Sequence, residues 1–135
     1  MINMQKNVTL VFAVLFAVIG VAGLVPALAP TNEHGQLLLG IFQINTVQTY
    51  IHLLSAVAAG AALAGGTYYA NTYLKVFGIV YALVALWGLP GFTGAYDGVL
   101  FGLIHVNAAT EVLHVVIAAL ALYAGFSPVK TTAKA

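Results

Sequence analysis

Two histidines, His52 and His114, are the side chains of this sequence best placed to do chemistry in an apolar setting. Each follows an asparagine (Asn45 or Asn107) by seven residues, and 62 positions separate them, since 114 − 52 = 62. On helices, both imidazoles would lie about 10 Å beyond the helix start. Two facing imidazoles could ligate a haem iron, or one could ligate a chlorophyll-type pigment. The alternative is structural: each histidine donates a hydrogen bond that stabilises the bundle.

Glu111 precedes His114 by three residues, so the two side chains form an i,i+3 pair on one helix face. The carboxylate could hold that imidazole protonated or fix its tautomer. Thr49 stands at the corresponding place in the first half (111 − 49 = 62), so the two histidine sites differ chemically. Glu111 and His114 are the one pair in the sequence that resembles an acid–base couple, and the first half of the chain has no equivalent pair. We therefore expect that the protein is not an enzyme.

Asn45 and Asn107 stand where a loop passes into an apolar stretch. Asparagine at such a place commonly caps the helix by accepting a hydrogen bond from a free N–H of the first turn. Gln48 completes a capping box with Asn45, and Glu111 puts a negative charge near the positive end of its helix. The alternative is that the two asparagines bind a ligand at the mouth of the bundle.

Four further ionisable residues fall in the loops, namely Glu33, His34, Asp97 and His105. Together they could form a metal site outside the membrane. However, no HxxxH or HxH spacing occurs among them, so we expect solvated loops and no metal site.

The composition requires elements that lie in lipid. The chain has 135 residues, of which 62% are hydrophobic and 5% charged, and its mean hydropathy is +1.04. A soluble domain carries about 25% charged residues, so this chain could not cover a surface that faces water. The net charge of +1 argues against a nucleic-acid partner, and the absence of cysteine excludes disulfides and thiol catalysis. Membrane lipid is the expected partner.

Four apolar stretches, at residues 8–28, 46–64, 73–89 and 108–126, are long enough to cross a bilayer. In lipid the backbone must satisfy its own hydrogen bonds, so we expect four transmembrane helices. Two shorter apolar segments, 37–42 and 99–104, cannot cross. We expect them to form turns or helices at the membrane interface, with pore-lining loops as the alternative.

The charges sort to opposite sides of the membrane. Four crossings place all the lysines on one face, and the loops with Glu33 and Asp97 on the other; the lysines are Lys6, Lys75, Lys130 and Lys134. The positive-inside rule then predicts that both termini and the 65–75 turn face the cytoplasm. The first stretch also resembles a signal peptide that could be cleaved near Ala29. Because it is long and has a counterpart later in the chain, we expect it to be retained.

The two halves of the chain repeat each other. Three matched pairs share an offset of 62 and three share an offset of 64: Gly40–Gly102, Asn45–Asn107, His52–His114, and Asn7–Asn71, Leu10–Leu74, Pro26–Pro90. We therefore predict one membrane domain, made of a repeat at about 1–64, a repeat at about 65–128 and a short tail at 129–135. Two parallel two-helix repeats predict an all-α, up-down-up-down bundle with a pseudo-two-fold axis along the membrane normal.

The segments Gly-Ile-Phe-Gln-Ile-Asn (40–45) and Gly-Leu-Ile-His-Val-Asn (102–107), each followed by its histidine, resemble a known family. It is an uncharacterised bacterial family of small four-span membrane proteins, a domain of unknown function, and the resemblance covers nearly the whole chain. In that family a further His and Asn often follow the motif asparagine by three and four residues. This sequence has Gln48 and Thr49, or Thr110 and Glu111, at those places. The resemblance implies the architecture and no activity.

Three functional classes remain. The first, which we expect, is a structural or accessory subunit that associates laterally with itself or with a larger membrane complex. Small residues at helical spacing favour it, in the sets Ala56, Gly60, Ala64 and Ala13, Ala17, Gly20. The second is a haem- or pigment-binding electron-transfer protein that uses His52 and His114. The third is a small transporter or channel subunit.

Overall fold

The computed structural model describes residues 3–92, 99–100 and 103–129 of the chain. Within them lie four α-helices: α1 (Met4–Ala22), α2 (Thr46–Gly65), α3 (Thr67–Phe92) and α4 (Ala108–Phe126). Each is long and apolar enough to cross a membrane, as the sequence predicts. The same residues contain five short strands, in the α1–α2 and α3–α4 connections: β1 (Thr31–Asn32), β2 (Gly35–Leu38), β3 (Phe42–Ile44), β4 (Val99–Leu100) and β5 (Ile104–His105).

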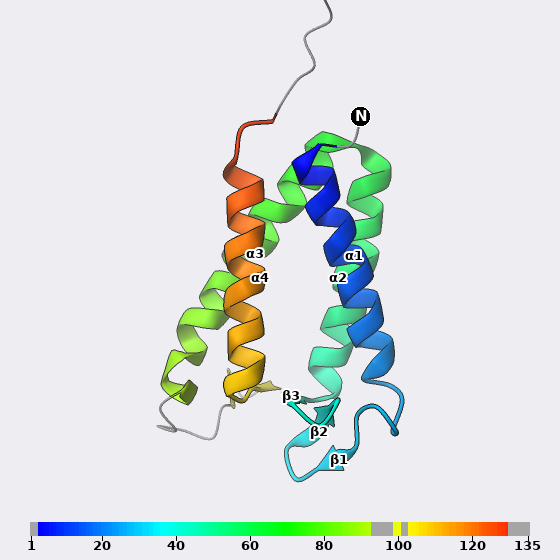
Figure 1. Ribbon diagram of the computed structural model, residues 1–135, viewed down its shortest axis with the longest axis vertical. Coiled ribbons are helices and arrows are strands. Elements are labelled where there is room, and N and C mark those ends of the chain that lie inside the picture. The colour runs from blue at the N-terminus through cyan, green and yellow to red at the C-terminus, as the bar shows by residue number, and fades with distance from the viewer. Residues whose placement is uncertain (1–2, 93–98, 101–102, 130–135) are drawn as a thin grey trace, which may run out of the picture.

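The bundle has two different ends, which Figure 1 shows at the top and bottom. At the terminal end, Asn3 Nδ2 donates to Thr67 Oγ1 (3.0 Å) and Gln5 Nε2 donates to the Ala124 carbonyl (3.0 Å). At the strand end lie the β-strands and the first turns of α2 and α4. Successive helices therefore run in opposite directions. The main packing partners are α1 with α2 and α3 with α4, while α2 and α4 lie farthest apart.

Two helices differ in length from the sequence prediction, and the local caps explain why. The first helix begins earlier, because the Asn3 side chain accepts a hydrogen bond from the Lys6 amide. It ends at Ala22, not near residue 28, because Gly23 passes into a run of turns. The third begins at Thr67, because Gly66 alone turns the chain, at φ 103°. Only glycine adopts such an angle without strain.

The short apolar segments belong to hairpins. A turn at 39–41 joins two strands in the first segment, so the predicted turn is confirmed there, whereas the predicted helix is wrong. β2 and β3 pair in antiparallel register, with Leu38 opposite Phe42. The turn between them places Leu39 and Gly40 in the left-handed region, at φ 54° and 73°. Successive positive φ angles match the twist of a hairpin and break a helix. In the second repeat β4 pairs with β5 in the same way.

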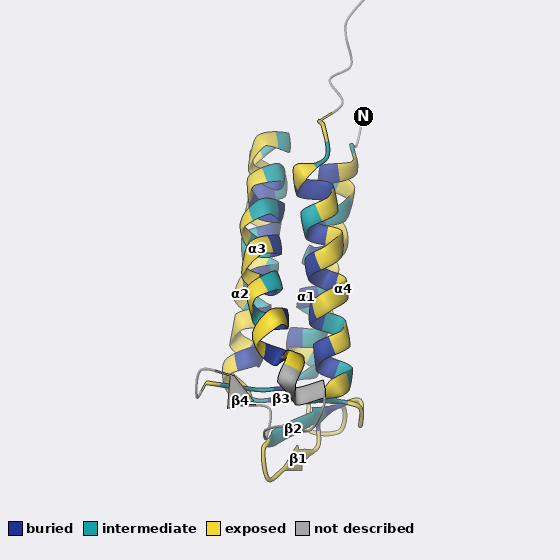
Figure 2. Ribbon diagram, turned by 90° about the vertical axis from the view of Figure 1, so that its left-hand side faces the viewer, coloured by how far each residue is buried: buried dark blue, intermediate teal, exposed yellow. Residues whose placement is uncertain are grey.

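Burial follows the pattern expected for a bundle in lipid. Many large apolar residues are exposed on every helix, whereas the buried positions include aromatic residues and alanines. Figure 2 shows buried and exposed positions along the same helices. The main core contains Phe12, Phe16, Tyr73, Leu74, Tyr81 and Ile117, with alanines at 59, 62, 118, 121 and 124. Small residues on facing helices let the backbones approach closely.

Candidate functional site

Polar side chains line the inner faces of α2 and α4 from the strand end into the bundle. On α2 they are Gln48, Thr49, His52 and Ser55, and on α4 they are Thr110, Glu111 and His114. All are buried, with His52 exposing 6% and His114 exposing 4% of its surface. Their spacing of three and four residues puts each set on one helix face. The first three residues of the α2 set correspond to the α4 set through the offset of 62, whereas Ser55 corresponds to Ile117, so the repeat builds most of the polar stripe twice.

The two histidines are connected by a chain of rings. His52 stacks on Phe16 of α1, with centroids 5.9 Å apart, and Phe16 stacks on Tyr81 of α3 at 5.7 Å. Tyr81 in turn contacts His114 at 5.8 Å. All four helices thus contribute one ring to this layer. A macrocycle ligated by both imidazoles would need the space that Phe16 and Tyr81 fill, so the layer does not fit a haem between the histidines.

The predicted pairing of Glu111 with His114 is not formed. In the part of the chain that the structure describes, both Glu111 carboxylate oxygens and His114 Nδ1 are buried without a hydrogen-bond partner, and the same is true of His52 Nδ1. The carboxylate instead lies against Gly88 of α3, where an added Cβ would collide with it. Burying a polar group without a partner is costly, so a ligand, ion or water that supplied partners here would bind favourably.

Asn45 and Asn107 cap their helices, as the sequence predicts, and each side chain also makes a hydrogen bond to the other repeat. Asn45 Oδ1 accepts from the Gln48 amide and Asn107 Oδ1 accepts from the Thr110 amide, both at 3.0 Å. Each Nδ2 then donates to a carbonyl of the other repeat, Asn45 to Leu103 and Asn107 to Ile41, both at 2.8 Å. We call this pair of cross-repeat bonds the asparagine clasp.

A second reciprocal pair of bonds reinforces the clasp. Gln48 Oε1 closes the capping box with the Asn45 amide (3.0 Å) and also accepts from the His105 amide (3.2 Å). In the other direction, Thr110 Oγ1 donates to the Gln43 carbonyl (2.9 Å). Residues 48 and 110 are equivalent by the offset of 62, as are 43 and 105, so the same pairs of positions are joined twice, with the side chain accepting at Gln48 and donating at Thr110. The strand end is therefore a shared structure to which both halves contribute.

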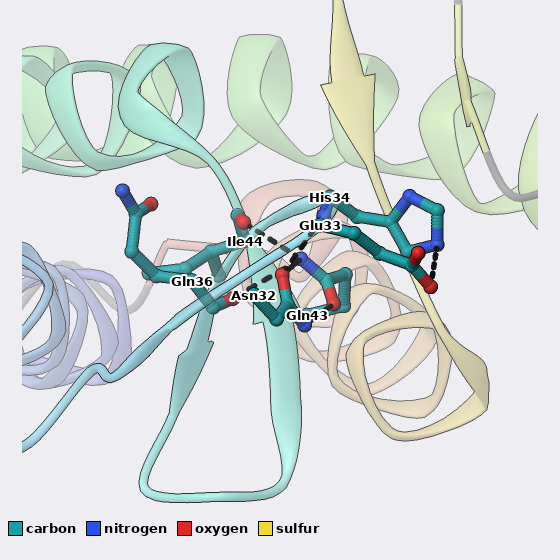
Figure 3. Close-up of polar contacts among 6 residues, drawn as sticks. All are labelled: Asn32, Glu33, His34, Gln36, Gln43 and Ile44. Carbon is teal, nitrogen blue, oxygen red and sulfur yellow. Dashed lines mark hydrogen bonds and ion pairs between the residues drawn. The ribbon is translucent and has the colours of Figure 1, made fainter.

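Polar contacts also order the first connection (Figure 3). Gln43 Nε2 donates to the Gln36 and Ile44 carbonyls (3.1 and 3.0 Å), and Asn32 Nδ2 donates to Gln43 Oε1 (2.7 Å). His34 Nε2 lies 3.3 Å from Glu33 Oε1.

The loop histidines meet, although the sequence did not predict it. The His34 ring stacks on that of His105, with centroids 4.3 Å apart. In the part of the chain that the structure describes, no three His, Cys, Asp or Glu side chains gather into a metal site. Asp97, the fourth predicted loop residue, lies outside the described residues, as do Gly102, Lys130 and Lys134.

The family follows from a comparison of sequences. The profile of a domain of unknown function, DUF4383, matches residues 6–127. The chain belongs to the DUF4383 family. No curated protein and no solved structure matches it significantly.

The site of this DUF4383 protein contains rings that sequence reasoning missed. Phe16 and Tyr81 have no counterpart through the repeat offset, because residues 80 and 17 are Val and Ala. The sequence does contain a signal for the polar stripe. Four polar residues recur at helical spacing in an otherwise apolar stretch, namely Gln48, Thr49, His52 and Ser55.

A second feature of the DUF4383 protein lies on the lipid-facing side of α2. Gly60, Ala61 and Ala64 are exposed and leave a smooth strip on that helix. Apart from its own stretch of helix, no atom of the described residues lies within 4 Å of a Cβ built at Gly60. In contrast, an added Cβ would come closer than 3.0 Å to another part of the chain at each of Gly20, Gly65, Gly78, Gly88 and Gly125. Those glycines are explained by packing inside the protein, and Gly60 is not.

Proposed function

We propose that this protein is a non-catalytic structural or accessory subunit of the bacterial inner membrane, which associates laterally through α2. The exposed Gly60 is the observation that carries the proposal. A glycine inside a helix costs about 0.5–1 kcal/mol relative to alanine. At Gly60 no neighbour within the chain requires the missing side chain, so a helix from outside the chain is its natural partner.

A second copy of the chain suits this face best. Gly60 and Ala64 form a small-xxx-small pair, the arrangement with which parallel transmembrane helices approach closely. Two copies inserted in the same sense present α2 in parallel and can pair about a two-fold axis along the membrane normal. Leu54 and Val57, exposed at 69% and 70%, lie one to two turns away on the same helix and would flank the contact.

Single-cysteine variants test the contact cleanly, because the chain contains no cysteine of its own. We expect Ala61→Cys to form disulfide-linked dimers when membranes are oxidised, whereas Val116→Cys, on the exposed side of α4, serves as the collision control. Adding Gly60→Leu should reduce the Ala61→Cys dimer about tenfold. Adding Ala119→Leu, an equally bulky change on α4, should leave it unchanged. Equal cross-linking at positions 61 and 116, or a dimer that survives Gly60→Leu, would contradict the proposal.

For orientation we propose a cytoplasmic terminal end. Lys6 lies in the first turn of α1, and Lys75 Nζ lies 5.3 Å from the ring of Phe126 near the end of α4, so both described lysines are at this end. Glu33 and Glu111 are at the strand end. This distribution follows the positive-inside rule.

A further inference from the structure

A cavity of about 220 Å³ opens at the strand end of the α1–α2 pair. One wall is apolar and comes from the turns after α1, with Leu24, Pro26 and Ala29. The polar lining of the cavity includes Gln36 of β2 and Thr46 and Thr49 from the first turn of α2. None of its lining residues is charged. The cavity is distinct from the ring layer, which lies deeper in the bundle.

Among the described residues, two buried polar atoms on side chains that line this cavity have no hydrogen-bond partner. They are Thr49 Oγ1 and Gln36 Oε1, and Thr49 exposes only 1% of its surface. Gly23 packs against the hydroxyl, since an added Cβ there would lie 2.7 Å from Thr49 Oγ1. A buried group without a partner destabilises the empty protein, so a molecule that bonds to both atoms would gain binding energy.

We propose that this cavity binds the neutral, hydroxyl-bearing headgroup of a membrane lipid, such as the sugar of a glycolipid. A hydroxyl both donates and accepts hydrogen bonds. A sugar hydroxyl can therefore donate to Gln36 Oε1, and it can either donate to the Thr49 hydroxyl or accept from it. The uncharged lining offers no counter-charge to a phosphate or an ammonium group. The volume corresponds to roughly seven water molecules at about 30 Å³ each, which is room for a single sugar.

The position of the cavity indicates a lipid as the source of the headgroup. The cavity lies beside the first turn of α2, where the helix leaves the lipid, and headgroups are found at this depth. The exposed side chains of Val21 and Leu24 lie next to it and would contact the acyl chains. The second repeat has Glu111 in place of Thr49, so this pattern of neutral groups belongs to the first repeat.

Thermal unfolding in nanodiscs tests the proposal. We would compare discs of phosphatidylcholine alone with discs that contain increasing amounts of monoglucosyldiacylglycerol. The wild-type protein should unfold at higher temperature as the glycolipid is added, because a ligand that binds the folded state stabilises it. Thr49→Val should shift this titration to about tenfold higher glycolipid, as expected for one lost hydrogen bond. Without glycolipid, Thr49→Val should unfold no earlier than wild type, since its hydroxyl has no partner to lose.

Two further variants sharpen the test. Gln36→Met removes the other bonding atom and should weaken the glycolipid effect in the same way. Thr72→Val is the matched control, because the Thr72 hydroxyl bonds within α3, to the Tyr68 carbonyl, away from the cavity. An unchanged titration in both Thr49→Val and Gln36→Met would overturn the proposal and leave water as the occupant. Equal stabilisation by free glucose in phosphatidylcholine discs would overturn the lipid as the source.

Discussion

Asn45 Nδ2 donates a hydrogen bond to the Leu103 carbonyl oxygen, 2.8 Å away, and so ties the start of α2 to the connection of the other repeat. The equivalent bond from Asn107 to Ile41 has the same length. The acceptors differ by 62 positions (103 − 41), as do the donors (107 − 45). The repeat of the sequence is therefore also a repeat of these two hydrogen bonds. It joins the two halves at the strand end, where the polar stripe begins.

Asparagine variants should separate the cap from the clasp. Asn45→Ala removes both, so we expect it to cost about 2 kcal/mol, about half from the cap and half from the clasp. Asn45→Asp keeps the accepting oxygen but loses the Nδ2 donor, so it should cost only about 1 kcal/mol. Unfolding by dodecyl sulfate in mixed micelles, followed by circular dichroism, measures the difference. An aspartate variant as unstable as the alanine variant would show that the cap contributes nothing.

The contact between Gly88 and Glu111 predicts a strong coupling. Gly88→Ala should destabilise the protein by about 1–3 kcal/mol, because the new Cβ collides with the buried carboxylate. In a Glu111→Ala background the same change should cost less than about 0.5 kcal/mol, and a double-mutant cycle measures this coupling. Gly60→Ala is the control in monomeric micelles, where it should stabilise the helix. Additive effects at 88 and 111 would refute the contact.

The ring layer predicts that the purified protein is colourless. Phe16 and Tyr81 lie in the contact path between His52 and His114, so we expect no Soret absorption after expression with added haem. An absorption spectrum of the purified protein checks this directly. A Soret band lost in both His52→Ala and His114→Ala would overturn this prediction and restore the electron-transfer hypothesis.

Cysteine labelling checks the orientation in the membrane. Glu33→Cys at the strand end should react with an impermeant maleimide in spheroplasts, because the Glu33 side chain is 84% exposed. Pro128→Cys, just beyond α4, should react only after the membrane is permeabilised. The reverse pattern would place the termini outside and remove the positive-inside argument.

The sequence was most informative where a helix begins with a recognisable cap. The predicted starts at Thr46 and Ala108 are confirmed, because each follows an asparagine at the end of a loop. The predicted end of the first helix near residue 28 is wrong. Residues 23–28 are as apolar as a helix in lipid, but their backbone forms turns, and the Leu28 carbonyl accepts a hydrogen bond from the Leu39 amide. Hydropathy reports the solvent of a segment and not its backbone conformation.

The hairpins and the ring layer could not be derived from one sequence. A run such as Leu37–Phe42 is too short for periodicity to distinguish a strand from a helical turn. Leu39 adopts a left-handed conformation in the turn between β2 and β3, which excludes a helix there. Leucine rarely adopts such angles, so its presence gave no sign of this turn. For Phe16 and Tyr81, nothing in the sequence separates an aromatic ring that faces the core from one that faces lipid. The choice depends on how the helices are rotated.

The asparagine clasp also sets an order for biogenesis. The first repeat leaves the ribosome before the second, yet its Asn45 amide and Ile41 carbonyl find their partners at Leu103 and Asn107. An inserted first hairpin therefore carries two unmet polar groups at its strand end until α4 has entered the bilayer. Maturation of the strand end is thus post-insertional. A nascent chain stalled before residue 103 should expose that end to proteases which the finished protein resists.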